Sequence, residues 1–158
     1  MKKSILALLL LSSSILSAQD IEVIKFQELD RLINEDSKEI RVFNFWATWC
    51  KPCIAELPYF EEINSKHGGD IKVYLISLDF VEDLNSKVIS FVQRKKLQSI
   101  IKLLDETDYN SFIDKVSTDW SGAIPATLFV DSRNGRQKFY EGEFTRDELN
   151  EEFNQFMR

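Results

Sequence analysis

Residues 40–53 read IRVFNFWATWCKPC, and they contain the only two cysteines of the 158-residue chain, Cys50 and Cys53. The apolar run 40–46 predicts a strand that is buried on both faces. We expect a helix to follow, with both thiols on its first turn. The unpaired N–H groups and partial positive charge of a helix N-terminus favour a thiolate at Cys50. Cys53, one turn later, is placed to attack a mixed disulfide formed by Cys50, so the spacing predicts a redox-active pair.

Two other roles compete for a pair of cysteines at this spacing. A zinc site normally has four protein ligands, and the only histidine of the chain is His67, so no metal is expected. A purely structural disulfide is the second alternative, but closing so short a loop removes little entropy from the unfolded chain. Neither alternative accounts for the neighbouring Trp49 and Pro52.

The first residues have the pattern of a secretory signal: Lys2 and Lys3, then the uncharged stretch 4–19, with small residues before a cut after Ala18. A membrane anchor is the alternative, but 16 residues are fewer than the ~20 that span a bilayer. We therefore expect a signal peptide over 1–18, a single domain over 19–158, and a periplasmic protein that is not inserted in the membrane after cleavage.

The chain carries 20 basic and 26 acidic residues, a net charge of −6 that becomes more negative when Lys2 and Lys3 are removed. An acidic chain is not expected to bind nucleic acid, where a basic face is the rule. A monomer is expected. The basic run Arg94–Lys96 is interpreted as a solvated helix end.

Hydrophobic periodicity and turn signals predict the remaining elements. Strands are expected at 21–24, 41–46, 71–78, 100–104, 126–130 and 137–141, and helices at 26–33, 50–66, 84–95, 109–116 and from Thr145 onward. Pro58 predicts a kink in the second helix. Asn134-Gly135 is a hairpin signal, and Thr145–Glu148 fits a capping box. The alternation of strands and helices, which ends in two adjacent strands and a helix, predicts an α/β fold in which a central mixed sheet is flanked by helices on both faces.

From about Val23 onward the chain resembles the thioredoxin superfamily, and within it the extracytoplasmic TlpA/ResA-like thiol–disulfide oxidoreductases. The resemblance rests on three motifs in order: 45–53 (FWATWCKPC), 56–58 (ELP) and 124–127 (IPAT). It implies a thioredoxin-like three-layer sandwich. The segment of about 80–120 is similar to the insertion typical of this branch and of peroxiredoxins.

The resemblance also implies roles for individual residues. Pro125 is expected to be cis and to pack beside the cysteines, with the backbone of Ile124 pairing with substrate. Trp49 is expected on the substrate-binding surface, whereas Trp46 is expected in the core. Trp120 has a groove and a core position as alternatives.

Charged and polar residues near the cysteines show one departure from thioredoxin. Where thioredoxin has a buried aspartate, this chain has Asn44, which cannot accept a proton. Glu56 matches an acidic residue of the TlpA/ResA branch and is expected to handle the proton of Cys53, the alternative being a solvated glutamate near a helix start. Lys51 and Pro52 are expected to tune the redox potential. His67 is expected to close the helix.

The sequence thus predicts a periplasmic reductant of disulfides in exported proteins, with apocytochrome c as one candidate substrate. It needs no cofactor and is re-reduced by a membrane electron-delivery thiol protein. A disulfide-forming oxidase or isomerase on the same fold is one alternative, since direction depends on reduction potential. A non-enzymatic chaperone or assembly adaptor is the alternative of another class.

Overall fold

A computed structural model describes residues 21–158, so the predicted signal segment 1–18 lies outside the described residues. In chain order the elements are β1 (Glu22–Ile24), α1 (Phe26–Asn34), β2 (Ile40–Trp46), α2 (Lys51–His67), β3 (Ile71–Ser77), η1 (Val81–Asp83), η2 (Leu84–Val88), α3 (Ile89–Lys95), β4 (Ile100–Leu104), η3 (Tyr109–Ser111), α4 (Ile113–Val116), β5 (Ala126–Asp131), β6 (Arg136–Glu141) and α5 (Arg146–Phe156). Within this part of the chain no helix combines the length and the apolar character that a membrane span requires.

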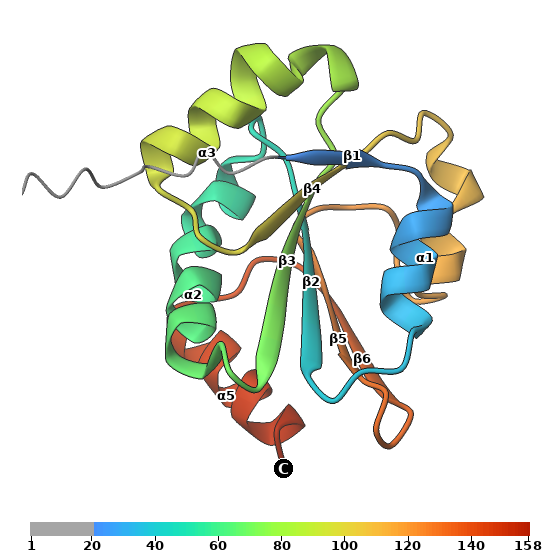
Figure 1. The fold of residues 1–158 in the computed structure, drawn as a ribbon, viewed down its shortest axis with the longest axis vertical. Helices are drawn as coiled ribbons and strands as arrows, with labels where there is room; N and C mark the ends of the chain where they lie inside the picture. The colour runs from blue at the N-terminus through green and yellow to red at the C-terminus, as the bar shows by residue number, and fades with distance from the viewer. Residues whose placement is uncertain (1–20) are drawn as a thin grey trace, which may run out of the picture.

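The six strands form one mixed sheet in the order β1-β4-β3-β2-β5-β6. The strands β1, β4, β3 and β2 are parallel, whereas β5 runs antiparallel to β2 and β6 antiparallel to β5. In Figure 1, α2, α3 and α5 cover one face of the sheet, and α1 covers the other together with the segment that carries α4. The predicted three-layer thioredoxin-like sandwich is confirmed.

Strand β2 lies at the centre of the sheet, and all seven of its residues are buried. Because side chains alternate along a strand, Phe43 and Phe45 face the α1 side of the sheet, while Val42 and Trp46 face α2. The same alternation directs Asn44 towards α2, where its amide meets Glu56. A polar side chain in the middle of a fully buried strand is thereby brought next to the helix of the cysteines.

Two predicted helices are interrupted. The helix expected over 84–95 begins as a π-helical turn (η2), directly after a 3₁₀ turn (η1), and becomes α-helical only at Ile89. The Asp83 carboxylate gives no cap and pairs with Lys87 instead. The helix expected over 109–116 is divided at Phe112, whose backbone leaves the helical region (φ −129°) while its side chain is fully buried against Phe26 and Trp120. Tertiary packing overrides the helical pattern there.

The local signals near the C-terminus are confirmed. The β5–β6 hairpin turns at Asn134-Gly135, where Gly135 has the positive φ (+67°) that glycine tolerates. Thr145 and Glu148 form the reciprocal hydrogen bonds of a capping box at the start of α5. Helix α5 buries Leu149, Phe153 and Phe156, and the His67 ring at the end of α2 lies 5.1 Å from that of Phe153.

Candidate active site

The two cysteines lie where the loop after β2 enters α2, and they form a disulfide in this structure. Cys50 is the N-cap of the helix, and the backbone N–H of Cys53 donates to its Sγ over 3.3 Å. Pro52 occupies the first turn, where its missing N–H leaves no bond unmade. A thiolate at Cys50 would receive this N–H and the positive end of the helix, which is the electrostatic setting that favours a nucleophilic sulfur.

The surroundings of the two sulfurs differ. Cys53 is fully buried, while Cys50 keeps 5% of its surface exposed. Trp49, directly before Cys50, is 62% exposed, and Lys51 and Pro52 are exposed as well. Of the two sulfur-bearing residues, only Cys50 therefore reaches the surface, and the exposed Trp49 lies directly before it.

The loop before β5 lies against the disulfide. The Ile124 carbonyl oxygen is 3.8 Å from Cys50 Sγ, and the Ile124–Pro125 peptide bond is cis, as predicted. Trp120 donates from its indole N–H to the Ala123 carbonyl (2.8 Å) and packs against Phe45, 4.6 Å between ring centroids. Trp120 is thus a buried core residue that supports this loop, which decides between the two positions left open for it.

The Glu56 carboxylate is fully buried beneath the disulfide helix. Its Oε1 accepts a hydrogen bond from the Asn44 side-chain amide and its Oε2 accepts one from the Phe144 backbone N–H, both 2.8 Å. The Asn44 amide also donates to Thr127 Oγ1 on β5 (3.2 Å). The solvated alternative for Glu56 is therefore wrong, and one carboxylate joins α2, β2 and the segment that precedes α5.

Burial dominates the acidity of Glu56. Loss of solvent raises its pKa from the ordinary 4.5 to about 7, a charge at Glu143 adds to the rise, and the hydrogen bonds from Phe144 and Asn44 only partly oppose it. A carboxyl with a pKa near neutrality exchanges its proton readily in the physiological range, which is what a proton-handling group requires.

Asp79 is a residue that the sequence reasoning missed. It lies just beyond β3, is 3% exposed, and its carboxylate accepts hydrogen bonds from the Thr48 backbone N–H (2.9 Å), the Thr48 hydroxyl (2.5 Å) and the Ser77 hydroxyl (2.8 Å). These bonds tie the loop that carries Trp49 and Cys50 to the end of the neighbouring strand. A polar residue directly after a buried parallel strand was the available signal, because such residues meet at the carboxyl edge of the sheet.

The remaining candidates lie elsewhere. Trp46 is fully buried and packs against Phe91 of α3 with the two rings tilted, in the core position expected of it. His67 closes α2, far along the helix from the cysteines. Within residues 21–158 no group of three or more histidine, cysteine, aspartate or glutamate side chains is placed to hold a metal ion.

A thioredoxin-like sandwich with a Cys-X-X-Cys disulfide at a helix N-terminus and a cis-proline loop beside it defines a class of thiol–disulfide proteins. The model of the family described as AhpC/TSA matches residues 16–135. The chain belongs to the AhpC/TSA family.

Individual relatives agree with this assignment. The chain is 28% identical over 116 residues to the thioredoxin-like protein YneN of Bacillus subtilis (strain 168), covering 73% of this chain and 64% of that protein. It is 33% identical over 120 residues to the thiol-disulfide oxidoreductase ResA of Bacillus thuringiensis subsp. konkukian (strain 97-27), covering 74% and 64%. The match thus spans just under two thirds of these curated relatives.

Among solved structures, a thioredoxin-related protein from Neisseria meningitidis serogroup B superposes with a TM-score of 0.61 at 21% identity, covering 74% of this chain and 84% of that one. This likeness shows the fold.

Proposed function

We propose that the protein is an exported thiol–disulfide oxidoreductase that reduces disulfides of other exported proteins. The observation that carries the proposal is the pairing of Cys50, which keeps 5% of its surface exposed at the N-cap of α2, with the fully buried Cys53 one turn later. The printed name of ResA, a thiol-disulfide oxidoreductase, supports the reaction class. The signal-like pattern of residues 1–18 supports export of the domain 19–158.

The reaction proceeds in two exchanges. The Cys50 thiolate attacks one sulfur of the substrate disulfide, which forms a mixed disulfide and releases the other substrate sulfur as a thiolate. Cys53 then loses its proton and attacks Cys50 Sγ, which frees the second substrate thiol and leaves the Cys50–Cys53 disulfide. Two electrons have passed to the substrate, so an external dithiol protein must reduce the disulfide before the next turnover.

Each neighbouring group has a role in this scheme. The Cys53 N–H stabilises the Cys50 thiolate, both as attacking group and as leaving group. Glu56, buried under the helix with its raised pKa, takes up the Cys53 proton directly or through one water. Ile124, whose carbonyl lies 3.8 Å from Cys50 Sγ, aligns an extended substrate segment beside the sulfur. Lys51 and Pro52 adjust the potential of the pair.

Trapping tests the proposal. A Cys53→Ser variant should accumulate mixed disulfides between Cys50 and its protein substrates in the exported fraction of the cell, and a Cys50→Ser variant should not. Identification of the trapped proteins would show whether apocytochrome c is among them. Equal trapping by both variants would contradict the assigned roles, and full activity of a variant that lacks both cysteines would favour a chaperone or adaptor instead.

The direction of net electron flow has its own measurement. Equilibration of the protein with a series of dithiol–disulfide buffers gives the reduction potential of the pair. A reduction potential close to that of thioredoxin, about −270 mV, supports a reductant. A potential close to that of DsbA, about −120 mV, favours the alternative of a disulfide-forming oxidase.

A further inference from the structure

The seam between α2 and α3 is hollowed beside the disulfide. One hollow of about 200 Å³ has an apolar floor that includes Ile54, Leu57 and Phe91, and Lys95 at its rim. A second, of about 270 Å³, lies between Thr48 in the loop before α2 and the residues of η2 and α3, and it shares Phe91 with the first. We call the two together the α2–α3 groove. Its lining includes residues on either side of the cysteine pair along the chain: Ile54 directly follows Cys53, and Thr48 comes two residues before Cys50.

The rim of the groove is basic in an acidic protein. Residues 84–97 contain four cations, Lys87, Arg94, Lys95 and Lys96, and no aspartate or glutamate, whereas the whole chain has a net charge of −6. Lys87 is paired with Asp83 (2.8 Å). Within residues 21–158 no carboxylate lies within ion-pair distance of the other three.

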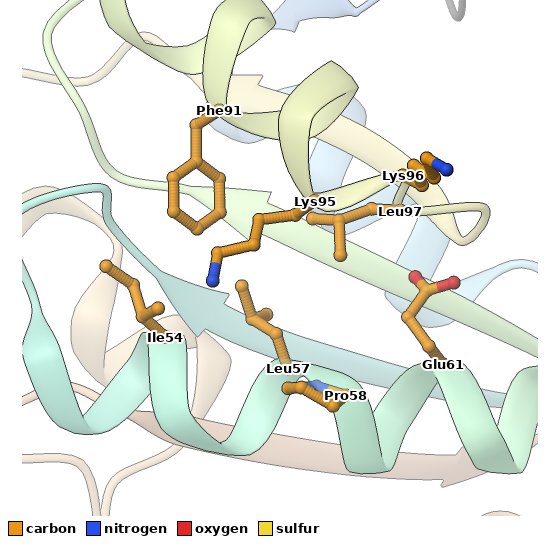
Figure 2. A pocket seen from close by; sticks show the side chains of 8 residues that line it. All are labelled: Ile54, Leu57, Pro58, Glu61, Phe91, Lys95, Lys96 and Leu97. Carbon is orange, nitrogen blue, oxygen red and sulfur yellow. The ribbon is translucent and has the colours of Figure 1, made fainter.

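The position of Lys95 is unusual for a surface lysine. Figure 2 shows its side chain extended across the first hollow, with the amino group between Phe91 and the α2 residues Ile54 and Leu57. The Nζ atom is 6.0 Å from the Phe91 ring centroid, and the Arg94 guanidinium is 5.7 Å from it. The face of the Phe91 ring attracts the charges of Arg94 and Lys95, and the aliphatic parts of both side chains lie along apolar surface. Neither cation has an anionic partner in residues 21–158.

The acidic residue at the groove is already engaged. Glu61 lines the first hollow, but its carboxylate accepts hydrogen bonds from the backbone N–H groups of Gln98 (2.7 Å) and Ser99 (3.0 Å). It fastens the loop after α3 to α2 at the far end of the groove. The second hollow, next to Thr48, is lined by hydroxyls, by two cations and by Phe91, and no carboxylate lines it.

We infer that the α2–α3 groove binds an acidic segment of the protein whose disulfide reacts at Cys50, with carboxylates at Arg94 and Lys95 and an apolar side chain against Ile54, Leu57 and Phe91. This rests on the proposed function. The cations Arg94 and Lys95 are complementary in charge to the carboxylates of an acidic partner. The concave apolar floor fits an inserted peptide side chain better than it fits a flat anionic membrane surface. The groove lies on the α3 side of the cysteines, so it would select partners independently of the Ile124–Pro125 loop.

The test compares two double variants that change the net charge equally. Arg94→Glu/Lys95→Glu reverses the rim of the groove. Lys38→Glu/Lys66→Glu reverses two exposed cations, one in the loop before β2 and one near the end of α2. Each reduced protein reacts with a short synthetic peptide that contains one disulfide flanked by aspartates and a leucine, with the same peptide carrying asparagines, and with the neutral reagent 2-hydroxyethyl disulfide.

The readout is the rate with the acidic peptide divided by the rate with the neutral reagent. We expect this ratio to fall about tenfold in the groove variant, mainly through KM, and to stay within about twofold in the control, because each reversal replaces an attraction by a repulsion. The asparagine peptide should show no such difference.

The possible failures are distinguishable. An unchanged ratio in the groove variant, with a parent protein that reacts normally with the neutral reagent, overturns the groove assignment alone. A parent protein that fails to react with the neutral reagent contradicts the proposed function. Binding of the parent, but not of the groove variant, to phosphatidylglycerol vesicles, together with an unchanged peptide ratio, would assign the cations to a lipid surface and overturn the inference.

Discussion

Residues 44–56 contain the disulfide, and residues 81–97 lie beside them. The two segments differ in how many of their polar side chains have hydrogen-bond or ion-pair partners within the chain. In the first segment Asn44, Glu56 and Thr48 are hydrogen-bonded to three other strands or loops. In the second, irregular turns lead into α3, whose Arg94 and Lys95 lie near the Phe91 ring and have no carboxylate within ion-pair distance in residues 21–158. Under the inferred binding at the α2–α3 groove, redox geometry and partner choice are carried by different parts of the molecule, the first by buried polar contacts and the second by exposed cations.

The largest effect on activity is expected from substitution of the cysteines in the first segment. Cys50→Ser should abolish disulfide exchange with every substrate, because Cys53 is fully buried and cannot be reached in its place. In the reduced parent protein, alkylation at pH 6–7 should modify Cys50 first, since its position at the helix N-terminus lowers its pKa. Mass spectrometry of the labelled protein is the measurement, and preferential labelling of Cys53 would reverse the two roles.

Glu56→Gln should have the next largest effect. The variant keeps the shape but removes the buried proton acceptor, so resolution of the mixed disulfide should slow about a hundredfold, within the range of a lost general base, while the pKa values of both thiols fall. Stopped-flow release of a trapped peptide and thiol titration give the two quantities. If both match the parent protein, Glu56 has only a structural role.

The same carboxyl gives the oxidised protein a distinct pH dependence. Because its pKa is raised to about 7 in the folded state, the proton binds more tightly there than in the unfolded chain, so its stabilisation is full below about pH 4.5 and is lost as pH rises through 7. The loss should be about 3 kcal/mol in the free energy of unfolding. Denaturation of the oxidised protein from pH 4 to 8 measures it, with Glu56→Gln as the control that lacks this part of the profile.

A smaller effect is expected at the loop beside the sulfur. Pro125→Ala should displace the Ile124 carbonyl from Cys50, and turnover of a protein disulfide should drop about tenfold through poorer alignment. Reaction with dithiothreitol, which needs no extended docking, should change less. Equal losses for both reagents would mean that Pro125 supports only the fold.

The smallest effect should come from Asp79, whose hydrogen bonds join the loop before Cys50 to the end of β3. Asp79→Asn removes one acceptor from the three bonds that hold Thr48 and Ser77, and should lower the unfolding free energy by about 1–2 kcal/mol. Denaturant titration measures this, with the exposed Asp36→Asn as a control that should leave stability unchanged. A matching loss in the control would remove any special role for Asp79.

Local sequence signals predicted the redox centre well because its geometry is local. A buried strand, a helix N-terminus and an i, i+3 spacing place Cys50 and Cys53 without long-range information. Glu56 was recognisable as a candidate, but its burial depends on Phe144, 88 residues away, whose N–H completes the carboxylate's bonds. Asp79 was missed for the same reason, since its partner Thr48 is 31 residues distant.

The segment 80–120 shows where pattern reasoning fails. Phe112 interrupts a predicted helix because its ring is needed in the core with Phe26 and Trp120. The run Arg94–Lys96 was interpreted as a solvated helix end, which sequence alone cannot distinguish from a basic rim. Only the packing of α3 against α2 shows that Lys95 lies across an apolar hollow.

The two edges of the sheet bear on how the protein behaves when it is concentrated. On one side the edge strand β1 is only three residues long, and on the other β6 carries Arg136, Lys138 and Glu141. Short edge strands and charged edge residues discourage the pairing of one chain's sheet with another's, which is a common start of aggregation. Both outer strands thus discourage the stacking of this protein into larger sheets at high concentration.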